Sequence, residues 1–238
     1  RKKSRVKETL EYFSVTRTAA AIERCDIAVL VIDAETGIVE QDKKIADLIT
    51  KNHRACIVVI NKWDLTSQAV KEARKEEIEH RKRKDRHRDN REKRLTTLGE
   101  FGQWVQEQLF FLDYAPVIFT SATEGFQLDR LLEAVRYVND QWHQRIPTPL
   151  LNRALKDIIE QRQPPNKAGK RFKLYYTAQV EGSPPAFTLF VNAPHVCTDQ
   201  YELYLSRQIR SAFGFEGCPI RLFVKERPKS IEPVRRHS

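Results

Sequence analysis

The chain has 238 residues, a formal net charge of +10 and no methionine. This length suits one large or two smaller domains, and we expect two. No apolar run approaches the roughly 20 residues that span a bilayer, which excludes a membrane-spanning protein at the level of sequence, and the basic charge favours a polyanionic partner such as nucleic acid.

The first residues and the cysteines indicate which kind of protein this is. The chain opens on Arg1 without a methionine and without a signal-peptide core, so we interpret it as a fragment of a soluble, cytoplasmic protein. The four cysteines stand far apart, with no C-x-x-C pair and no histidine cluster beside them. We therefore expect reduced thiols rather than a disulfide or a metal site, the four being Cys25, Cys56, Cys197 and Cys218.

Helices and strands alternate in the first part of the chain. A spacing near 3.6 predicts an amphipathic helix over Glu8–Arg24, and a second helix is expected from about Glu40 to Lys51. Continuous apolar runs over Asp26–Ala34 and Ala55–Ile60 predict strands buried on both faces. This alternation of helices and strands indicates an α/β domain built on a mostly parallel, doubly wound sheet.

Polar side chains follow the second of these strands, where open α/β sheets bind ligands. The carboxylate of Asp64 can accept two parallel hydrogen bonds from guanine, from N1–H and from the 2-amino group. The stem of Lys62 can lie along the face of a base, and Asn61 can brace the neighbouring loops. Asn-Lys-x-Asp after a hydrophobic strand is the guanine-specificity motif of small GTPases. The alternative is a solvated strand end with no ligand.

A charged insertion follows at about residues 67–97. Its middle, Lys71–Arg94, carries almost no apolar side chain, so it predicts a solvated helix or a partly disordered segment. The part from Arg81 to Arg94 is more strongly basic, which would suit an RNA-binding arm. No aromatic residue is interleaved for base stacking, so both interpretations stay open.

A third strand is expected at Pro116–Ala122, after a helix over Leu98–Leu112 and before a helix over Leu128–Arg145. It ends in Ser121-Ala122, where the backbone N–H groups of a tight turn can donate to an acceptor such as guanine O6. Ser-Ala alone is a weak signal. Its position at the end of the next parallel strand after Asn-Lys-x-Asp makes it a candidate for the same site.

A smaller α+β domain is predicted for residues 146–227, in the order α-β-β-α-β, with a basic tail at 228–238. The expected elements are helices over Thr148–Gln161 and Asp199–Phe213 and strands over Lys170–Val180, Ala186–Asn192 and Pro219–Lys225. In the first strand, Phe172, Leu174 and Tyr176 are predicted to face the core, with Lys173, Tyr175 and Thr177 on the other face. The order is that of KH-type RNA modules. Gly214-Phe215-Glu216-Gly217 matches their G-x-x-G, but it follows a helix and precedes a strand, so we interpret it as a helix end and a turn.

Several motifs together resemble the Der family, also called EngA, of bacterial GTPases. The motifs are Asn61-Lys62-Trp63-Asp64, Asp113-Tyr114-Ala115-Pro116, Ser121-Ala122, Arg145-Ile146-Pro147-Thr148, Gly169-Lys170-Arg171, Tyr175-Tyr176 and Gly214-Phe215-Glu216-Gly217-Cys218-Pro219-Ile220-Arg221. The resemblance implies that residues 1–145 are the later part of the second of two GTPase domains of P-loop type, and that 146–227 form the KH-like domain. It also implies GTP or GDP as ligand, the large ribosomal subunit and its rRNA as partner, and a monomer with a further GTPase domain upstream.

The sequence departs from this family in one respect that bears on activity. It contains no G-x-x-x-x-G-K-[ST], and the phosphate cradle, switch I and Asp-x-x-Gly are likewise missing. Mg²⁺ is thus expected only with the missing upstream half. We predict no catalytic residue, no metal ligand and no GTP hydrolysis for this chain alone. Two functions remain: a ribosome-assembly GTPase without its N-terminal part, or a ribosome- or RNA-binding scaffold with a vestigial nucleotide site.

Overall fold

The structure, a computed structural model, describes residues 16–65, 98–164 and 172–227. The start of the first expected helix, the charged insertion and the basic tail lie outside these residues. The chain divides into two compact units, one of Arg1–Trp142 with Glu216–Pro219 and the other of His143–Phe215 with Ile220–Ser238. No helix among the described residues is long and apolar enough to cross a membrane.

The first unit is built on a parallel sheet, as predicted. Strand β2 (Ala55–Asn61) lies between β1 (Ile27–Asp33) and β3 (Val117–Phe119) and runs parallel to both. The six residues 55–60 of β2 are buried, because a central strand packs against side chains on both faces. The register pairs Asp33 with Asn61, so these two strands end at the same level.

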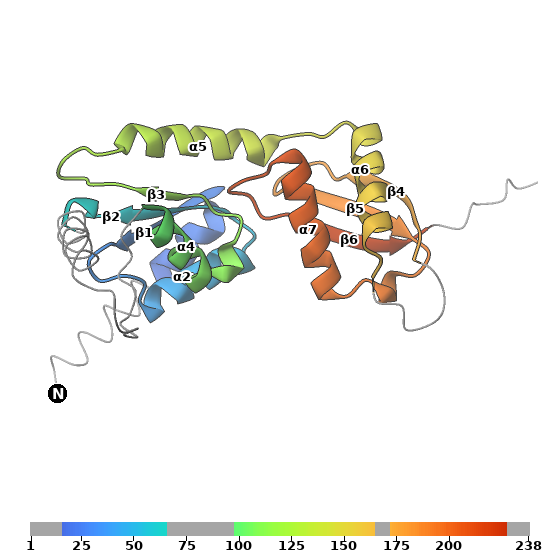
Figure 1. The fold of residues 1–238 in the computed structure, drawn as a ribbon, viewed down its shortest axis with the longest axis horizontal. Helices are drawn as coiled ribbons and strands as arrows, with labels where there is room; N and C mark the ends of the chain where they lie inside the picture. The colour runs from blue at the N-terminus through green and yellow to red at the C-terminus, as the bar shows by residue number, and fades with distance from the viewer. Residues whose placement is uncertain (1–15, 66–97, 165–171, 228–238) are drawn as a thin grey trace, which may run out of the picture. The chain divides into compact units, whose positions relative to one another are not determined.

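Helices lie on both sides of this sheet. Residues 16–24 are helical, and α2 (Glu40–Lys51), α4 (Leu98–Gln108) and α5 (Leu128–His143) follow along the chain. Figure 1 shows α5 on one side of the sheet, with α2 and α4 on the other. The helix predicted over 98–112 ends at Gln108, and a 3₁₀ turn, η1 (Phe110–Leu112), follows it. This tighter turn keeps Leu109 and Leu112, three residues apart, both in the core.

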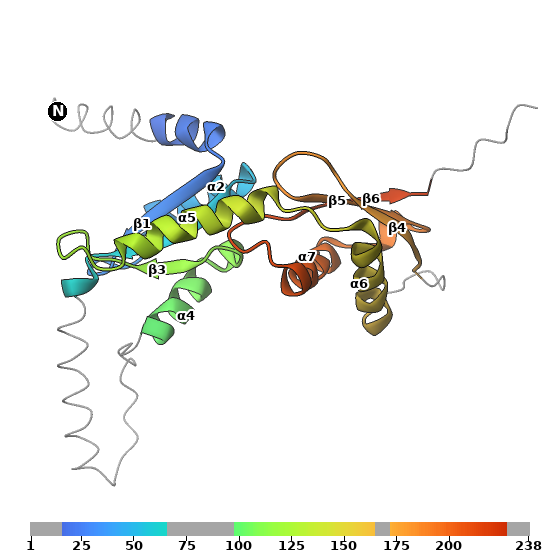
Figure 2. The ribbon, with the colours of Figure 1, turned by 90° about the horizontal axis from the view of Figure 1, so that it is seen from above.

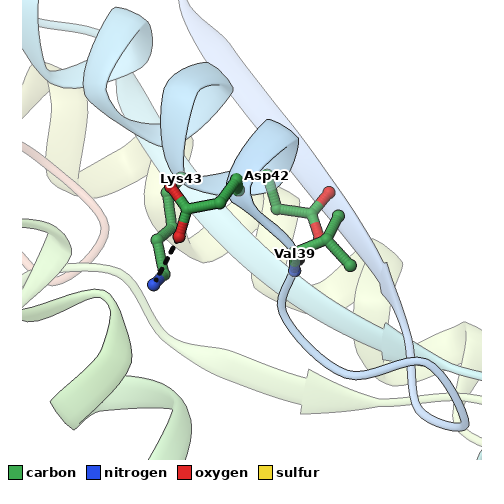
Figure 3. Close-up of polar contacts among 4 residues, drawn as sticks. Val39, Asp42 and Lys43 are labelled. Atoms are coloured by element: carbon green, nitrogen blue, oxygen red, sulfur yellow. Dashed lines mark hydrogen bonds and ion pairs between the residues drawn. The ribbon is translucent and has the colours of Figure 1, made fainter.

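The start of α2 is fixed without a polar N-cap side chain. Val39 precedes the helix, and its backbone N–H donates to the Asp42 carboxylate (3.0 Å; Figure 3). An ion pair between Lys43 Nζ and Glu40 Oε1 (3.1 Å) spans the first turn. The acidic side chains at this end also complement the helix dipole. The chain reaches this helix through a turn at Gly37, whose φ is 71°.

Two of the predicted strands are less buried than expected. The prediction that β1 is buried on both faces is wrong, since Val29 and Val31 are 41% and 55% exposed. Leu30 and Ile32, on the other face, belong to the core that α2 and α4 cover. The described helices therefore cover one face of β1 only. In β3, Val117 and Ile118 are half-buried, because this short strand lies at the edge of the described sheet.

The second unit has the predicted α-β-β-α-β order. Its elements are α6 (Thr148–Gln161), β4 (Leu174–Gln179), β5 (Ala186–Val191), α7 (Asp199–Phe213) and β6 (Arg221–Glu226), with a 3₁₀ turn, η2 (Pro194–Val196), before α7. Strand β5 is central, antiparallel to β4 and parallel to β6. Figure 2 shows α6 and α7 on the same side of this sheet. One face of the sheet is therefore core, with Phe187, Leu189 and Val191 fully buried beneath the helices.

The alternation predicted for β4 fails at one point. Leu174 faces the core as expected, but Tyr176 is 46% exposed and Thr177 is fully buried. The cause is a register shift between Leu174 and Tyr176, a bulge that turns the following side chains to the opposite face. Before the bulge, Phe172 is buried and Lys173 exposed, as the sequence predicts.

The Gly-x-x-Gly segment ends a helix, as expected. Gly214 follows α7 with a φ of 92°, and its N–H donates to the carbonyl of Arg210. The next residues, Glu216–Pro219, belong to the first unit. There Gly217 donates its N–H to the carbonyl of Tyr114 (2.6 Å) and accepts from the N–H of Cys56 (2.8 Å). All four cysteines are free thiols, and Cys56 and Cys218 are fully buried.

Candidate functional site

The candidate site lies where the three strands of the first unit end. In a parallel sheet the carboxyl ends meet at one edge, and here Asp33, Asn61 and Thr120 come from the ends of β1, β2 and β3. Backbone bonds continue the sheet past its last paired residues. The N–H of Ala34 donates to the carbonyl of Asn61 (2.9 Å), and the N–H of Thr120 donates to the carbonyl of Ile60 (2.8 Å).

The side chain of Asn61 joins the two segments that the sequence assigned to base recognition. Its Oδ1 accepts one hydrogen bond from Thr120 Oγ1 (3.2 Å) and another from the N–H of Ala122 (3.1 Å). A single amide oxygen thus holds the loop after β3 against the end of β2. A ligand atom that accepts from the N–H of Ala122 would share this donor with Asn61 Oδ1 or take the place of Oδ1.

The turn around Ser121 is closed by its own hydrogen bonds. The backbone groups of Ser121 and Phe126 bond to each other in both directions (3.0 and 3.2 Å). Ser121 Oγ accepts from the N–H of Glu124 (3.2 Å) and lies 3.1 Å from Thr123 Oγ1. Ser121 is fully buried, so its side chain shapes the loop, while Ala122 is exposed beside Asn61.

Asp64 lies at the start of a helix just past the end of β2. Residues 63–65 are helical, and the N–H of Trp63 donates to the carbonyl of Thr120 (3.0 Å). The indole of Trp63 packs edge-on against Phe119, with ring centroids 4.7 Å apart. This buried pair anchors the backbone on which Asp64 stands, and the Asp64 side chain is half-buried.

Lys62 is held from the neighbouring strand. Its Nζ lies 2.6 Å from Oδ2 of Asp33, and its backbone has a φ of 62°, in the left-handed region that non-glycine residues seldom adopt. The ammonium lowers the pKa of the Asp33 carboxyl, with help from the N–H of Glu35, and Asp33 in turn raises the pKa of Lys62.

The structure therefore brings Asn61 and Ala122 into direct contact and places Lys62, Asp64 and Ser121 on the same two segments. Sequence analysis missed Asp33 and Thr120. Both end neighbouring parallel strands at the same edge as Asn61, so the rule that identified Asn61 could also have identified them. Among the described residues no group of three or more His, Cys, Asp or Glu side chains is placed to hold a metal ion.

Comparison with protein families assigns both units. Residues 11–140 match the elongation factor Tu GTP-binding domain, and residues 145–225 match the KH-domain-like, C-terminal part of EngA bacterial GTPase enzymes. The chain belongs to the Der (EngA) GTPase family. Membership confirms the resemblance that the motifs indicated and the fold class of a GTPase-type α/β domain followed by a KH-like domain.

Individual Der proteins match nearly the whole chain. GTPase Der of Acetivibrio thermocellus is 39% identical over 229 residues, which is 96% of this chain and 46% of the relative. GTPase Der of Halothermothrix orenii is 40% identical over 95% of this chain and 46% of its own length, and that of Sulfurihydrogenibium sp. is 42% identical over 94% and 44%. The chain thus spans less than half the length of these Der relatives.

Proposed function

We propose that the strand ends of the first unit bind the guanine base of GTP or GDP, as part of a GTPase that acts in assembly of the large ribosomal subunit. The observation that carries the proposal is the Asn61 side chain. Its two hydrogen bonds hold the Asn-Lys-x-Asp segment and the Ser-Ala turn together as one polar edge. Binding of a rigid, flat base requires both segments at once, since each reads a different side of the ring.

Each residue has a role in this proposal that follows from its chemistry. The Asp64 carboxylate accepts from N1–H and the 2-amino group of guanine, and adenine, which lacks this pair of donors, is refused. The methylene stem of Lys62 covers one face of the base. At the turn of Ser121 and Ala122, the N–H of Ala122 is the proposed donor to O6 and would be shared with Asn61 Oδ1, because the N–H of Ser121 already pairs with the carbonyl of Phe126.

Hydrolysis is proposed for the longer protein and not for this chain. Catalysis of phosphoryl transfer consists mostly of positioning phosphates, Mg²⁺ and water, and the sequence has no G-x-x-x-x-G-K-[ST] to do so. With about 20 heavy atoms at roughly 0.3 kcal/mol each, guanosine should bind with a dissociation constant on the order of 0.1 mM or weaker.

The remaining assignments follow from family membership. We propose that residues 1–145 are the later part of a GTPase domain with the insertion at about 67–97, that 146–227 are the KH-like domain, and that the protein acts as a cytoplasmic monomer. Large ribosomal subunits and their rRNA are the proposed partners, which suits the net charge of +10. A scaffold with a vestigial nucleotide site is the outcome that a failed base-recognition test would favour.

Replacing Asp64 with Asn tests the proposed base contact. Xanthine carries a carbonyl at position 2, to which the amide N–H of the new Asn can donate. Guanine carries an amino group there, so two hydrogen-bond donors would face each other. Guanosine binding should weaken by about 1.5–3 kcal/mol, roughly tenfold to a hundredfold, and xanthosine binding should strengthen relative to it. Nuclear magnetic resonance (NMR) titrations of the chain with each nucleoside measure the change.

Asp129→Asn is the matched control, because Asp129 also lies in the first turn of a helix, in α5, and is exposed. It should leave nucleoside preference unchanged. If Asp64 only complements the helix start, Asp64→Asn should cost about 1 kcal/mol of stability and weaken both nucleosides equally, which would remove the guanine-specific function.

A further inference from the structure

The ion pair between Lys62 and Asp33 lies within the polar edge proposed to bind guanine, but Asp33 belongs to none of the motifs found in the sequence. We propose that Asp33 is a positioning residue for guanine recognition, whose carboxylate holds the Lys62 ammonium so that the stem of the side chain covers the face of the base. The inference rests on the proposed function and adds a residue from a different strand to the same site.

Asp33 is itself fixed on several sides, so it can serve as an anchor. The register of the sheet places it directly beside Asn61. Its Oδ1 accepts the N–H of Glu35 (2.9 Å), and its backbone carbonyl accepts the N–H of Gly37 (2.9 Å). Its second oxygen, Oδ2, is the one that faces the Lys62 ammonium at 2.6 Å. One carboxylate therefore closes the turn after β1 and orients the lysine after β2.

Both ends of the Lys62 side chain are constrained as a result. Its backbone is in the left-handed conformation with a φ of 62°, which sets the direction in which the side chain leaves the chain, and the ion pair fixes its tip. The four-carbon stem between these points has fewer conformations open to it than that of an unpaired lysine. A lysine ordered before the ligand arrives does not lose this freedom on binding, so less of the binding free energy is spent on ordering it.

The charges around Lys62 agree with this geometry. Asp33 raises the pKa of Lys62 most, and the negative charges of Glu35 and Asp64 raise it further. Asp33, whose pKa is lowered, stays ionised at neutral pH. The pair is therefore charged on both sides over the whole range between the ordinary pKa values of 3.8 for Asp and 10.5 for Lys.

A second ion pair in the same unit provides a matched control. Lys51 Nζ lies 2.6 Å from Asp47 Oδ2, the same distance, but this pair spans one turn of α2, away from the strand ends. Solvent reaches both pairs: the side chains of Lys51 and Asp47 are 71% and 52% exposed, and those of Lys62 and Asp33 are 51% and 31% exposed. Exposed pairs of that kind contribute little to stability. If ion pairs act here only through general charge or stability, Asp47→Asn and Asp33→Asn should have similar effects.

The test measures guanosine binding by NMR titration in six forms of the 238-residue chain. These are the wild type, Asp33→Asn, Asp33→Glu, Lys62→Gln, the double variant of Asp33→Asn with Lys62→Gln, and Asp47→Asn. Asp33→Asn keeps an oxygen for the N–H of Glu35, and thermal melting monitors whether each form is folded. Guanosine is used without phosphates, so that a change in charge near Lys62 does not itself alter attraction to the ligand.

Ordering one long side chain corresponds to a change in affinity of roughly twofold to tenfold. We expect Asp33→Asn to weaken guanosine binding by that factor, Asp33→Glu to restore most of it, and Asp47→Asn to leave it unchanged. In the Lys62→Gln background, Asp33→Asn should have no further effect, because there is no ammonium left to position. A structural role for Asp33 would instead weaken binding equally in both backgrounds.

The outcomes separate this inference from the function on which it rests. If the wild type does not bind guanosine in preference to adenosine, both are overturned. If the wild type binds guanosine selectively and Asp33→Asn binds it equally well, the guanine site stands and the role of Asp33 is refuted.

Discussion

Replacing Asn61 with Ala should loosen the turn that carries Ser121 and Ala122. The variant removes the Oδ1 acceptor for Thr120 Oγ1 (3.2 Å) and for the N–H of Ala122 (3.1 Å). A typical hydrogen bond contributes about 0.5–1.5 kcal/mol, and these two are long for bonds of their kind, so the expected loss is about 1–2 kcal/mol. This corresponds to a roughly fivefold to thirtyfold increase in opening of the turn.

Amide hydrogen exchange measures the loss directly. Exchange at Ala122 should accelerate by that factor in Asn61→Ala, while amides of β5 in the second unit serve as internal reference and should not change. Asn61→Asp keeps an acceptor oxygen and should retain most of the protection. Thr120→Val removes one of the two donors at nearly constant volume, so it should give about half the effect.

Unchanged exchange at Ala122 in Asn61→Ala would refute the reasoning. It would mean that the turn is held by the paired backbone groups of Ser121 and Phe126 alone, and that the Asn61 side chain is free to serve the ligand. An equal acceleration in Asn61→Asp would also contradict it, because the acceptor would then not be the feature that matters.

Three further predictions concern the stability of the two units. Gly217→Ala should destabilise the protein strongly, because a Cβ at this position would lie 2.4 Å from Val138 Cγ2 and the backbone φ is 79°. Gly125→Ala is the control: its φ is 70° but nothing lies within 4 Å of the added Cβ, so it should cost only the backbone strain of about 1–2 kcal/mol. Urea unfolding compares the two variants. Burial raises the pKa of Cys56 to about 12, so the thiol of the folded protein stays protonated at pH values where that of the unfolded chain ionises. The free energy of unfolding should therefore fall as the pH rises above about 9, and it should fall less in Cys56→Ala. Thr198→Ala removes the N-cap bond of α7 and should cost about 1 kcal/mol, seen as a lower urea midpoint for the second unit.

Most of the fold followed from patterns that a single strand or helix carries by itself. The apolar run of β2 predicted a central strand because nothing polar interrupts it, and all six of its apolar residues are buried. The prediction for β1 failed on one face, because a strand that is apolar at every position does not show which of its faces other elements will cover. At Tyr176 the alternation was broken by a bulge, a feature of strand pairing that no local pattern announces.

The candidate site was predicted in outline and not in its internal bonds. The positions of Asn61 and Ala122 at neighbouring strand ends followed from the rule for parallel sheets, but the bond between them depends on three-dimensional register. Asp33 shows the same limit, because an aspartate at a strand end is common and its partner Lys62 is set by the pairing of β1 with β2.

Strand β1 has a consequence for handling the chain in solution. It is at the edge of the described sheet, with Val29 and Val31 exposed on one face, and an apolar edge strand is a template for pairing with a second molecule. Purified chain should therefore associate as its concentration rises, more so in salt that screens the repulsion between molecules of charge +10. A lysine in place of Val31 would protect this edge, as charged residues do on the edge strands of natural proteins.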